Sequence, residues 1–308
     1  MPRADINPLV SPDGLEIHVA DLTATIGAEL PLDRLQRQLP DHLWLSVDGK
    51  DEKIGDLVKL NATGPLRLGF GGWRDLLLGC QFHNGQGELI TAGGRTVKNV
   101  AGYDLTKLMV GQAGILGRIA TVTTRLYRRP VDGLLAEFAR DKPIADFLAT
   151  DCRPQWAVLT PDALFCGYLG DEAMIDLIEN RLPAFQPRRV MRHGFTGDVQ
   201  WRQEHWRVDG EVQMRASFPP ARVFEFAKAA ELTNWIADAA FGIVRAGVDE
   251  GSINRLTQAA RAVDGRAWFF SRDGELARFD LTPEERAILQ KIKTAMDPAD
   301  RLPPLRRS

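Results

Sequence analysis

One stretch, residues 93–119, contains the residues that could bind an aromatic cofactor. It opens with paired glycines and closes with three more, Gly111, Gly114 and Gly117. Glycine has no Cβ, so this backbone can approach a flat ring or a phosphate closely. Between the glycines stand four hydrogen-bonding side chains, Lys98, Asn99, Tyr103 and Asp104. Their order favours a segment that hydrogen-bonds the edge of a ring system, over a surface loop whose glycines only make turns.

Other chemistries have little support in the sequence. A GxxxxGK[ST] motif is missing, and the three closing glycines do not make GxGxxG, so the usual nucleotide-phosphate motifs are absent. The five histidines are scattered without metal-ligand spacing, so we predict no metal site. No serine stands in a GxSxG turn and no cysteine has a base nearby in sequence. Catalytic residues therefore stay unassigned.

The chain of 308 residues is long enough for two domains. Its formal net charge of −2 implies no general affinity for nucleic acid or a membrane surface. Three separated cysteines suit a reducing compartment, and no apolar run approaches the ~20 residues that cross a bilayer. We expect a cytoplasmic protein, with any membrane association made through partner subunits.

The pattern of the sequence changes at residue 130. Before it, short strand patterns alternate with glycine-rich turns. After it, strands interleave with longer helices, which predicts a sheet covered by helices on one face. One helix is predicted over 171–182 with Asp171 as its N-cap. The last helix begins with a capping box, Thr282 to Glu285, and carries an apolar stripe formed by Ile288, Leu289, Ile292, Ala295 and Met296.

Several of these segments resemble a known family. RTVKNVAGYDL at 95–105 and LMVGQAGILG at 108–117 are similar to the signature of flavoproteins of the vanillyl-alcohol oxidase type. Within that group they resemble the FAD-binding subunit of bacterial glycolate oxidase. NATGPLR at 61–67, WRD at 73–75 and IKTAMDP at 292–298 match the same pattern.

The resemblance implies an α+β fold in which a PCMH-type FAD-binding domain is joined to an α+β cap domain with an antiparallel sheet. The FAD-binding domain would span residues 1–130 and lack the family's usual first βαβ unit. The cap would span 131–280, and a C-terminal helix and tail, 281–308, would return to the FAD-binding domain.

The resemblance also implies FAD as the cofactor, with three groups of neighbours. Along the pyrophosphate and ribityl chain would lie Asn61, Thr63, Gly64, Gly71 and Gly72. Backbone would be presented to the flavin or the adenine end by Gly111, Gly114, Ile115, Gly117 and Ile119. The adjoining wall would be shaped by Lys98, Asn99, Gly102, Tyr103 and Asp104.

Two hypotheses for the function stay open. In the first, the chain is the FAD-binding subunit of a glycolate oxidase-like 2-hydroxy-acid dehydrogenase, with a sister flavin subunit and an iron–sulfur subunit as partners. In the second, it is a scaffold subunit of such a complex that holds no cofactor. The intact stretch 98–119 favours the first hypothesis. The second is favoured by residues 1–54, which do not resemble the family's pyrophosphate loop. Whether the chain is itself an enzyme is left open.

Overall fold

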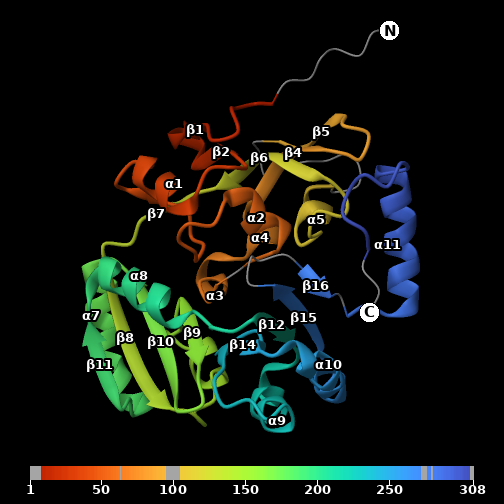
Figure 1. Ribbon diagram of the computed structural model, residues 1–308. Helices are drawn as coiled ribbons and strands as arrows, with labels where there is room; N and C mark the ends of the chain where they lie inside the picture. The colour runs from red at the N-terminus through yellow and green to blue at the C-terminus, as the bar shows by residue number, and fades with distance from the viewer. Residues whose placement is uncertain (1–7, 63, 95–104, 272–275, 279, 306–308) are drawn as a thin grey trace. The chain divides into compact units, whose positions relative to one another are not determined.

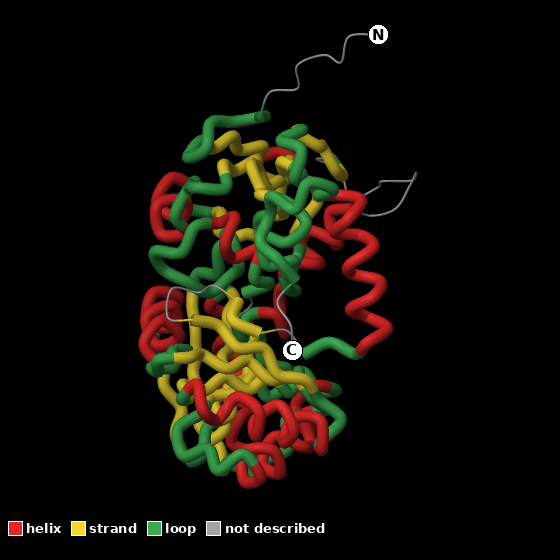
Figure 2. Tube along the Cα trace, turned by 45° about the vertical axis from the view of Figure 1, so that its right-hand side comes forward, coloured by secondary structure: helices red, strands yellow, loops and turns green. Residues whose placement is uncertain are grey.

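The computed structural model describes residues 8–62, 64–94, 105–271, 276–278 and 280–305 (Figure 1). The chain forms two compact units. Unit 1 is made from residues 1–63, 71–129 and 281–305, and unit 2 from residues 64–70, 130–280 and 306–308. In both units strands form the interior, with helices and loops outside them (Figure 2).

Unit 1 is built on a five-stranded sheet in the order β1-β2-β6-β4-β5, with every neighbouring pair antiparallel. Its strands are β1 (Leu15–His18), β2 (Thr23–Gly27), β4 (Leu77–His83), β5 (Leu89–Gly93) and β6 (Arg118–Arg125). A small two-stranded sheet pairs β3 (Leu43–Trp44) with β7 (Tyr127–Arg128). The helices are α1 (Leu32–Gln38), α2 (Ile54–Lys59), α4 (Trp73–Leu76), α5 (Leu105–Met109) and α11 (Pro283–Met296).

Strand β2 was not predicted from the sequence, although its segment TATIG alternates polar and apolar residues from Thr23 to Ile26. All five of its residues are buried between β1 and β6. The hydroxyl of Thr25 lies 3.1 Å from that of Thr123 on β6, so the two buried groups satisfy each other.

Unit 2 is built on a nine-stranded antiparallel sheet in the order β11-β8-β10-β9-β13-β14-β12-β15-β16. Its strands are β8 (Asp132–Ala139), β9 (Trp156–Leu159), β10 (Ala163–Gly170), β11 (Arg189–Arg192), β12 (Val212–Ser217), β13 (Ile236–Asp238), β14 (Ile243–Val248), β15 (Arg266–Ser271) and β16 (Leu276–Arg278). Its helices are α3 (Arg67–Phe70), α6 (Ala145–Leu148), α7 (Glu172–Arg181), α8 (Gly194–His205), α9 (Val223–Ala229) and α10 (Ile253–Ala262). The predicted α+β class is confirmed.

Helices cover both faces of this sheet, so the predicted cover on one face is wrong, and the two faces have different environments. Residues of α7, α9 and α10 join the main hydrophobic core with alternate residues of the strands, such as Met214 of β12. Helix α8 packs on the opposite face, where Trp156 of β9 donates a hydrogen bond from Nε1 to Asp198 of α8 at 2.7 Å. The predicted N-cap of α7 is confirmed, since Asp171 accepts a hydrogen bond from the backbone N–H of Met174.

The predicted capping box of α11 is also confirmed. The hydroxyl of Thr282 accepts from the N–H of Glu285, and the carboxylate of Glu285 accepts from the N–H of Thr282. The apolar stripe of this helix faces the core only in part. Met296 packs against the core of unit 1, but Ile288 is 60% exposed and the buried residue of the helix is Lys293.

Candidate functional site

The described part of the glycine-rich stretch starts at helix α5 and continues as a loop, residues 110–117, into strand β6. Five predicted neighbours of the cofactor precede it and lie outside the described residues, as does Thr63 from the first group. They are Lys98, Asn99, Gly102, Tyr103 and Asp104. The geometry of the site is therefore given by the loop and by the residues that contact it.

The loop is anchored on the C-terminal end of helix α2. The N–H of Gly111 donates to the carbonyl of Val58 at 3.0 Å, and the N–H of Ala113 donates to the carbonyl of Lys59 at 2.9 Å. Both carbonyls belong to the last turn of α2, where intrahelical donors run out, so the loop helps to cap the helix; that of Val58 also accepts from the N–H of Asn61 at 3.0 Å. Gly111, Ala113 and Gly114 all have left-handed backbone, with φ of 82°, 54° and 85°.

The structure brings Asn61 next to this loop. Asn61 follows α2 and has a left-handed φ of 47°. A Cβ added to Gly111 would lie 3.2 Å from the Cβ of Asn61, so the two residues are close neighbours. Around Gly114 there is more room, because a Cβ added there would make ordinary contacts of 3.6 Å with Pro303 and 3.8 Å with Lys59. Asn61, Gly111 and Gly114 thus form one side-chain-poor surface in unit 1.

A residue that sequence reasoning missed, Gln112, holds the loop in shape. Its side chain is buried, donates from Nε2 to the carbonyl of Gly117 at 2.9 Å and accepts from the N–H of Leu116 at 3.0 Å. A lone glutamine between glycines gives no sequence signal for such a clamp.

The remaining predicted residues of this group are packed into unit 1. The side chains of Ile115 and Ile119 are buried. A Cβ on Gly117 would lie 2.7 Å from the ring of Phe82, so this glycine is required by packing against β4. Only the backbone of these three residues could face a ligand.

Gly71 and Gly72 form the start of helix α4. Gly71 has a left-handed φ of 84°, and the N–H of Gly72 donates to the carboxylate of Asp75 at 2.9 Å. The amide of Gly72 therefore already has an acceptor within its own helix. Gly64 is buried and belongs to unit 2, whereas the other described members of the predicted site belong to unit 1.

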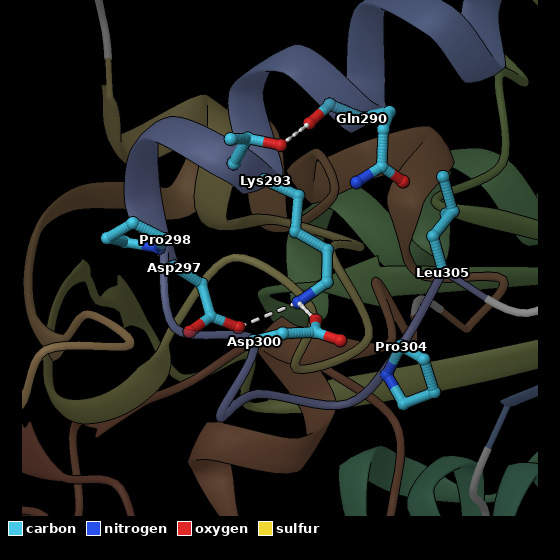
Figure 3. A pocket seen from close by; sticks show the side chains of 8 residues that line it. Gln290, Lys293, Asp297, Pro298, Asp300, Pro304 and Leu305 are labelled. Carbon is cyan, nitrogen blue, oxygen red and sulfur yellow. Dashed lines mark hydrogen bonds and ion pairs between the residues drawn. The ribbon is translucent and has the colours of Figure 1, made fainter.

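A pocket of about 230 Å³ lies beside helix α11, and none of the residues that line it belongs to the predicted site (Figure 3). Its lining is Gln290, Lys293, Thr294, Asp297, Pro298, Asp300, Pro304 and Leu305. The ammonium of Lys293 points to Asp297 and Asp300, at 2.7 and 3.0 Å. Burial works to lower the pKa of Lys293, but these carboxylates raise it above its usual value. The charged groups thus neutralise one another, which indicates a structural role at the C-terminal end of α11 and not a ligand site.

Within the described part of the chain, no three His, Cys, Asp or Glu side chains are grouped so that they could hold a metal ion. In the same residues no helix is both long and apolar enough to cross a membrane. Cys80, Cys152 and Cys166 are buried free thiols, and burial raises the pKa of both Cys152 and Cys166. A reactive thiolate would need the opposite shift.

Sequence comparison finds relatives of part of this chain. Over 82 residues it is 39% identical to glycolate oxidase subunit GlcE of Escherichia coli, which is 27% of this chain and 23% of that protein. Over 120 residues it is 34% identical to glycolate oxidase subunit GlcD of Bacillus subtilis, covering 38% and 26%. Over 131 residues it is 34% identical to an uncharacterized FAD-linked oxidoreductase of Mycobacterium tuberculosis, covering 42% and 27%. No protein-family model matches the chain.

The fold is shared over a longer range. A solved structure of alkyldihydroxyacetonephosphate synthase superposes on 93% of this chain and 65% of its own, with a TM-score of 0.63 and 13% identity. In sequence, by contrast, this chain matches only about a quarter of the length of these curated relatives. Part of the chain is therefore similar in sequence to glycolate oxidase subunits, and nearly all of it has the PCMH-type FAD-binding fold that the sequence predicted.

Proposed function

We propose that this chain is an FAD-binding subunit of a 2-hydroxy-acid dehydrogenase complex of the glycolate oxidase kind. The observation that carries the proposal is the left-handed glycine loop, residues 111–114, in a chain related to the glycolate oxidase subunits. Three left-handed residues with no side chain larger than a methyl group, Gly111, Ala113 and Gly114, allow a flat ligand to approach this backbone closely.

The described residues fit a flavin nucleotide as backbone contacts. Asn61, Gly111 and Gly114 offer a surface without large side chains, and Gln112 fixes it from beneath. A bound flavin would supply the acceptor for a hydride equivalent from the hydroxy acid, while the protein would orient and enclose it. Partners in electron transfer would be a sister flavin subunit and an iron–sulfur subunit.

A second candidate function has its own supporting observation. The amides of Gly72, Gly111 and Ala113 already donate to acceptors in unit 1, so they are not available to a pyrophosphate in this conformation. This favours a scaffold subunit that belongs to such a complex without holding FAD.

The two candidates are separated by the absorption spectrum of the purified full chain and by its melting temperature with added FAD. Bound ligand at a hundred times its Kd stabilises a protein by about 2.7 kcal/mol, which a melting curve resolves readily. A matched pair of variants locates the contact. Gly114 and Gly87 have nearly equal φ, 85° and 83°, but Gly87 lies in the β4–β5 turn with open space around it.

We expect G114A to weaken FAD binding more than G87A, because the two substitutions carry similar backbone strain and only one adds a methyl group to the loop. A protein without flavin bands that FAD does not stabilise would support the scaffold function instead. Equal FAD affinity in both variants would contradict the assignment of the loop.

A further inference from the structure

Helix α11 carries apolar residues that unit 1 covers only in part. Ile288 is 60% exposed, Ala295 is also exposed, and Ile292 between them is half-buried. These three residues are here called the outer stripe, and α11 lies on the outside of unit 1 (Figures 1 and 2). One exposed isoleucine needs no explanation, but apolar residues spaced four and three apart are typical of a helix that packs against a second helix.

The opposite side of the helix attaches it to unit 1. Lys293 is 2% exposed and pairs with Asp297, and Met296 packs against the core of unit 1. At about 100° per residue, Lys293 and Met296 are turned by about 140° and 80° from Ile288 around the helix axis. These contacts therefore fix the rotation of α11 and turn Ile288 away from the core of its own unit.

Two charged residues lie along one side of the outer stripe. Glu284 is one turn before Ile288 and Lys291 is nearly one turn after it, and both are exposed. Neither side chain forms an ion pair or a hydrogen bond within the part of the chain that the structure describes. The two residues are about 10 Å apart along the helix axis, too far to pair with each other.

The order of these charges is self-complementary. When two copies of α11 pack antiparallel about a two-fold axis near Ile288, Glu284 of one copy lies opposite Lys291 of the other, and the same pair forms a second time by symmetry. A parallel arrangement sets equal residue numbers at the same height, so it would not bring Glu284 and Lys291 together. The antiparallel pair also covers Ile288 of both copies.

We propose that α11 is a self-association surface through which two copies of this chain form a two-fold dimer with their helices antiparallel. The proposal rests on the outer stripe and on the charges beside it, and it is independent of FAD. One pair of helices buries less than the ~1,200 Å² of a standard interface, so the dimer should form in the micromolar range.

The test is sedimentation velocity of the full-length chain at concentrations from roughly 1 to 300 µM. I288E places a charge in the outer stripe. L177E is its matched control, because Leu177 is 49% exposed on α7 of unit 2. E284K and K291E are studied singly and as an equimolar mixture, and melting temperatures show which variants are folded.

We expect wild type and L177E to dimerise equally. I288E should associate at least roughly a hundredfold more weakly, because each dimer loses two covered isoleucines. E284K and K291E should each associate roughly tenfold more weakly, because like charges then face each other twice. Their mixture should regain the wild-type affinity, since opposite charges meet again in the mixed dimer.

Three results would overturn the proposal. A wild-type chain that is monomeric at every concentration would show that α11 does not pair with a second copy, whether or not it contacts another subunit. A dimer that I288E leaves unchanged would place the interface on another surface. A mixture of E284K and K291E that associates no more tightly than either variant alone would refute the antiparallel arrangement.

Discussion

The ammonium group of Lys293 lies 2.7 Å from Oδ2 of Asp297, one turn further along α11, and both side chains are almost fully buried. The same carboxylate accepts from the N–H groups of Arg301 and Leu302, both at 2.8 Å. The turn after the helix also contacts the β4–β5 hairpin, since the N–H of Gly85 donates to the carbonyl of the last helical residue, Met296. This ion pair therefore fixes the last helix of unit 1 at its C-terminal end.

The first prediction concerns acid stability. Burial alone would raise the pKa of Asp297, but the hydrogen bonds from Lys293 and the two backbone N–H groups lower it from 3.8 to about 2. A carboxyl whose pKa is lower in the folded than in the unfolded state stabilises the fold at any pH above its unfolded-state pKa. That stabilisation is lost as the pH falls through the folded-state pKa. We expect the melting temperature to drop between pH 4 and 2, and to drop less in D297N. D41N, at an exposed aspartate of unit 1, should follow wild type; equal slopes in wild type and D297N would contradict the assignment.

The second prediction has the opposite sign. Burial raises the pKa of Asp238 to about 7, although the N–H groups of Ala240 and Phe241 and the charge of Arg67 work against this. Between pH 4 and 7 the folded state therefore binds a proton that the unfolded state has released, so stability falls as the pH rises. D238N should reduce this fall in the melting temperature, and D141N, at an exposed site of unit 2, should not.

The third prediction concerns the buried pair of α8. The carboxylate of Asp198 accepts from Nε of Arg202 at 2.9 Å and from the indole of Trp156, and it is fully buried. Removing one member of such a pair leaves the other charge in the interior, which costs about 3 kcal/mol or more. We expect D198A to lower the urea midpoint of unit 2 accordingly. E204A, at an exposed site on the same helix, is the control, and equal midpoints for the two variants would contradict the prediction.

The fourth prediction separates packing from backbone strain in the glycine loop. A methyl group at Gly117 would lie 2.7 Å from Phe82 and 3.0 Å from the carbonyl of His83, whereas at Gly114 its contacts are ordinary. G117A should lose about 3 kcal/mol of stability through overpacking, and G114A about 1 kcal/mol through its left-handed φ. Urea unfolding of unit 1 measures both, and a larger loss in G114A would refute this account.

The fifth prediction concerns the start of α11. Thr282 and Glu285 each accept a hydrogen bond from the other's backbone N–H. T282A should cost about 1 kcal/mol and increase amide hydrogen exchange in the first turn of the helix. E284A changes the same turn without touching the cap, so a similar rise in exchange there would mean that the cap is not the cause.

Local signals in the sequence predicted the elements whose residues determine their own structure. The capping box of α11 and the N-cap Asp171 of α7 depend on neighbours three residues away, and both are present. Strand β2 was missed because its alternating segment is only four residues long. Its burial depends on pairing with β6, which is far along the chain and carries Thr123.

The candidate site divides in the same way. Glycine types and spacing predicted a close backbone approach to a ligand over residues 111–119, and the structure gives left-handed φ values at Gly111, Ala113 and Gly114. The approach of a ligand stays a prediction. The role of Gln112 was not predicted, because its bonds to Gly117 and Leu116 depend on the path of the folded loop and not on residue type.

The division of the chain into units constrains how it can be made. Unit 1 needs residues 281–305, which a ribosome releases only after it has synthesised nearly all of unit 2. During translation the nine-stranded sheet of unit 2 can therefore be completed before unit 1 has acquired helix α11. Expressing residues 1–130 alone would leave the hairpin at Gly85 without the helix end that its N–H normally contacts.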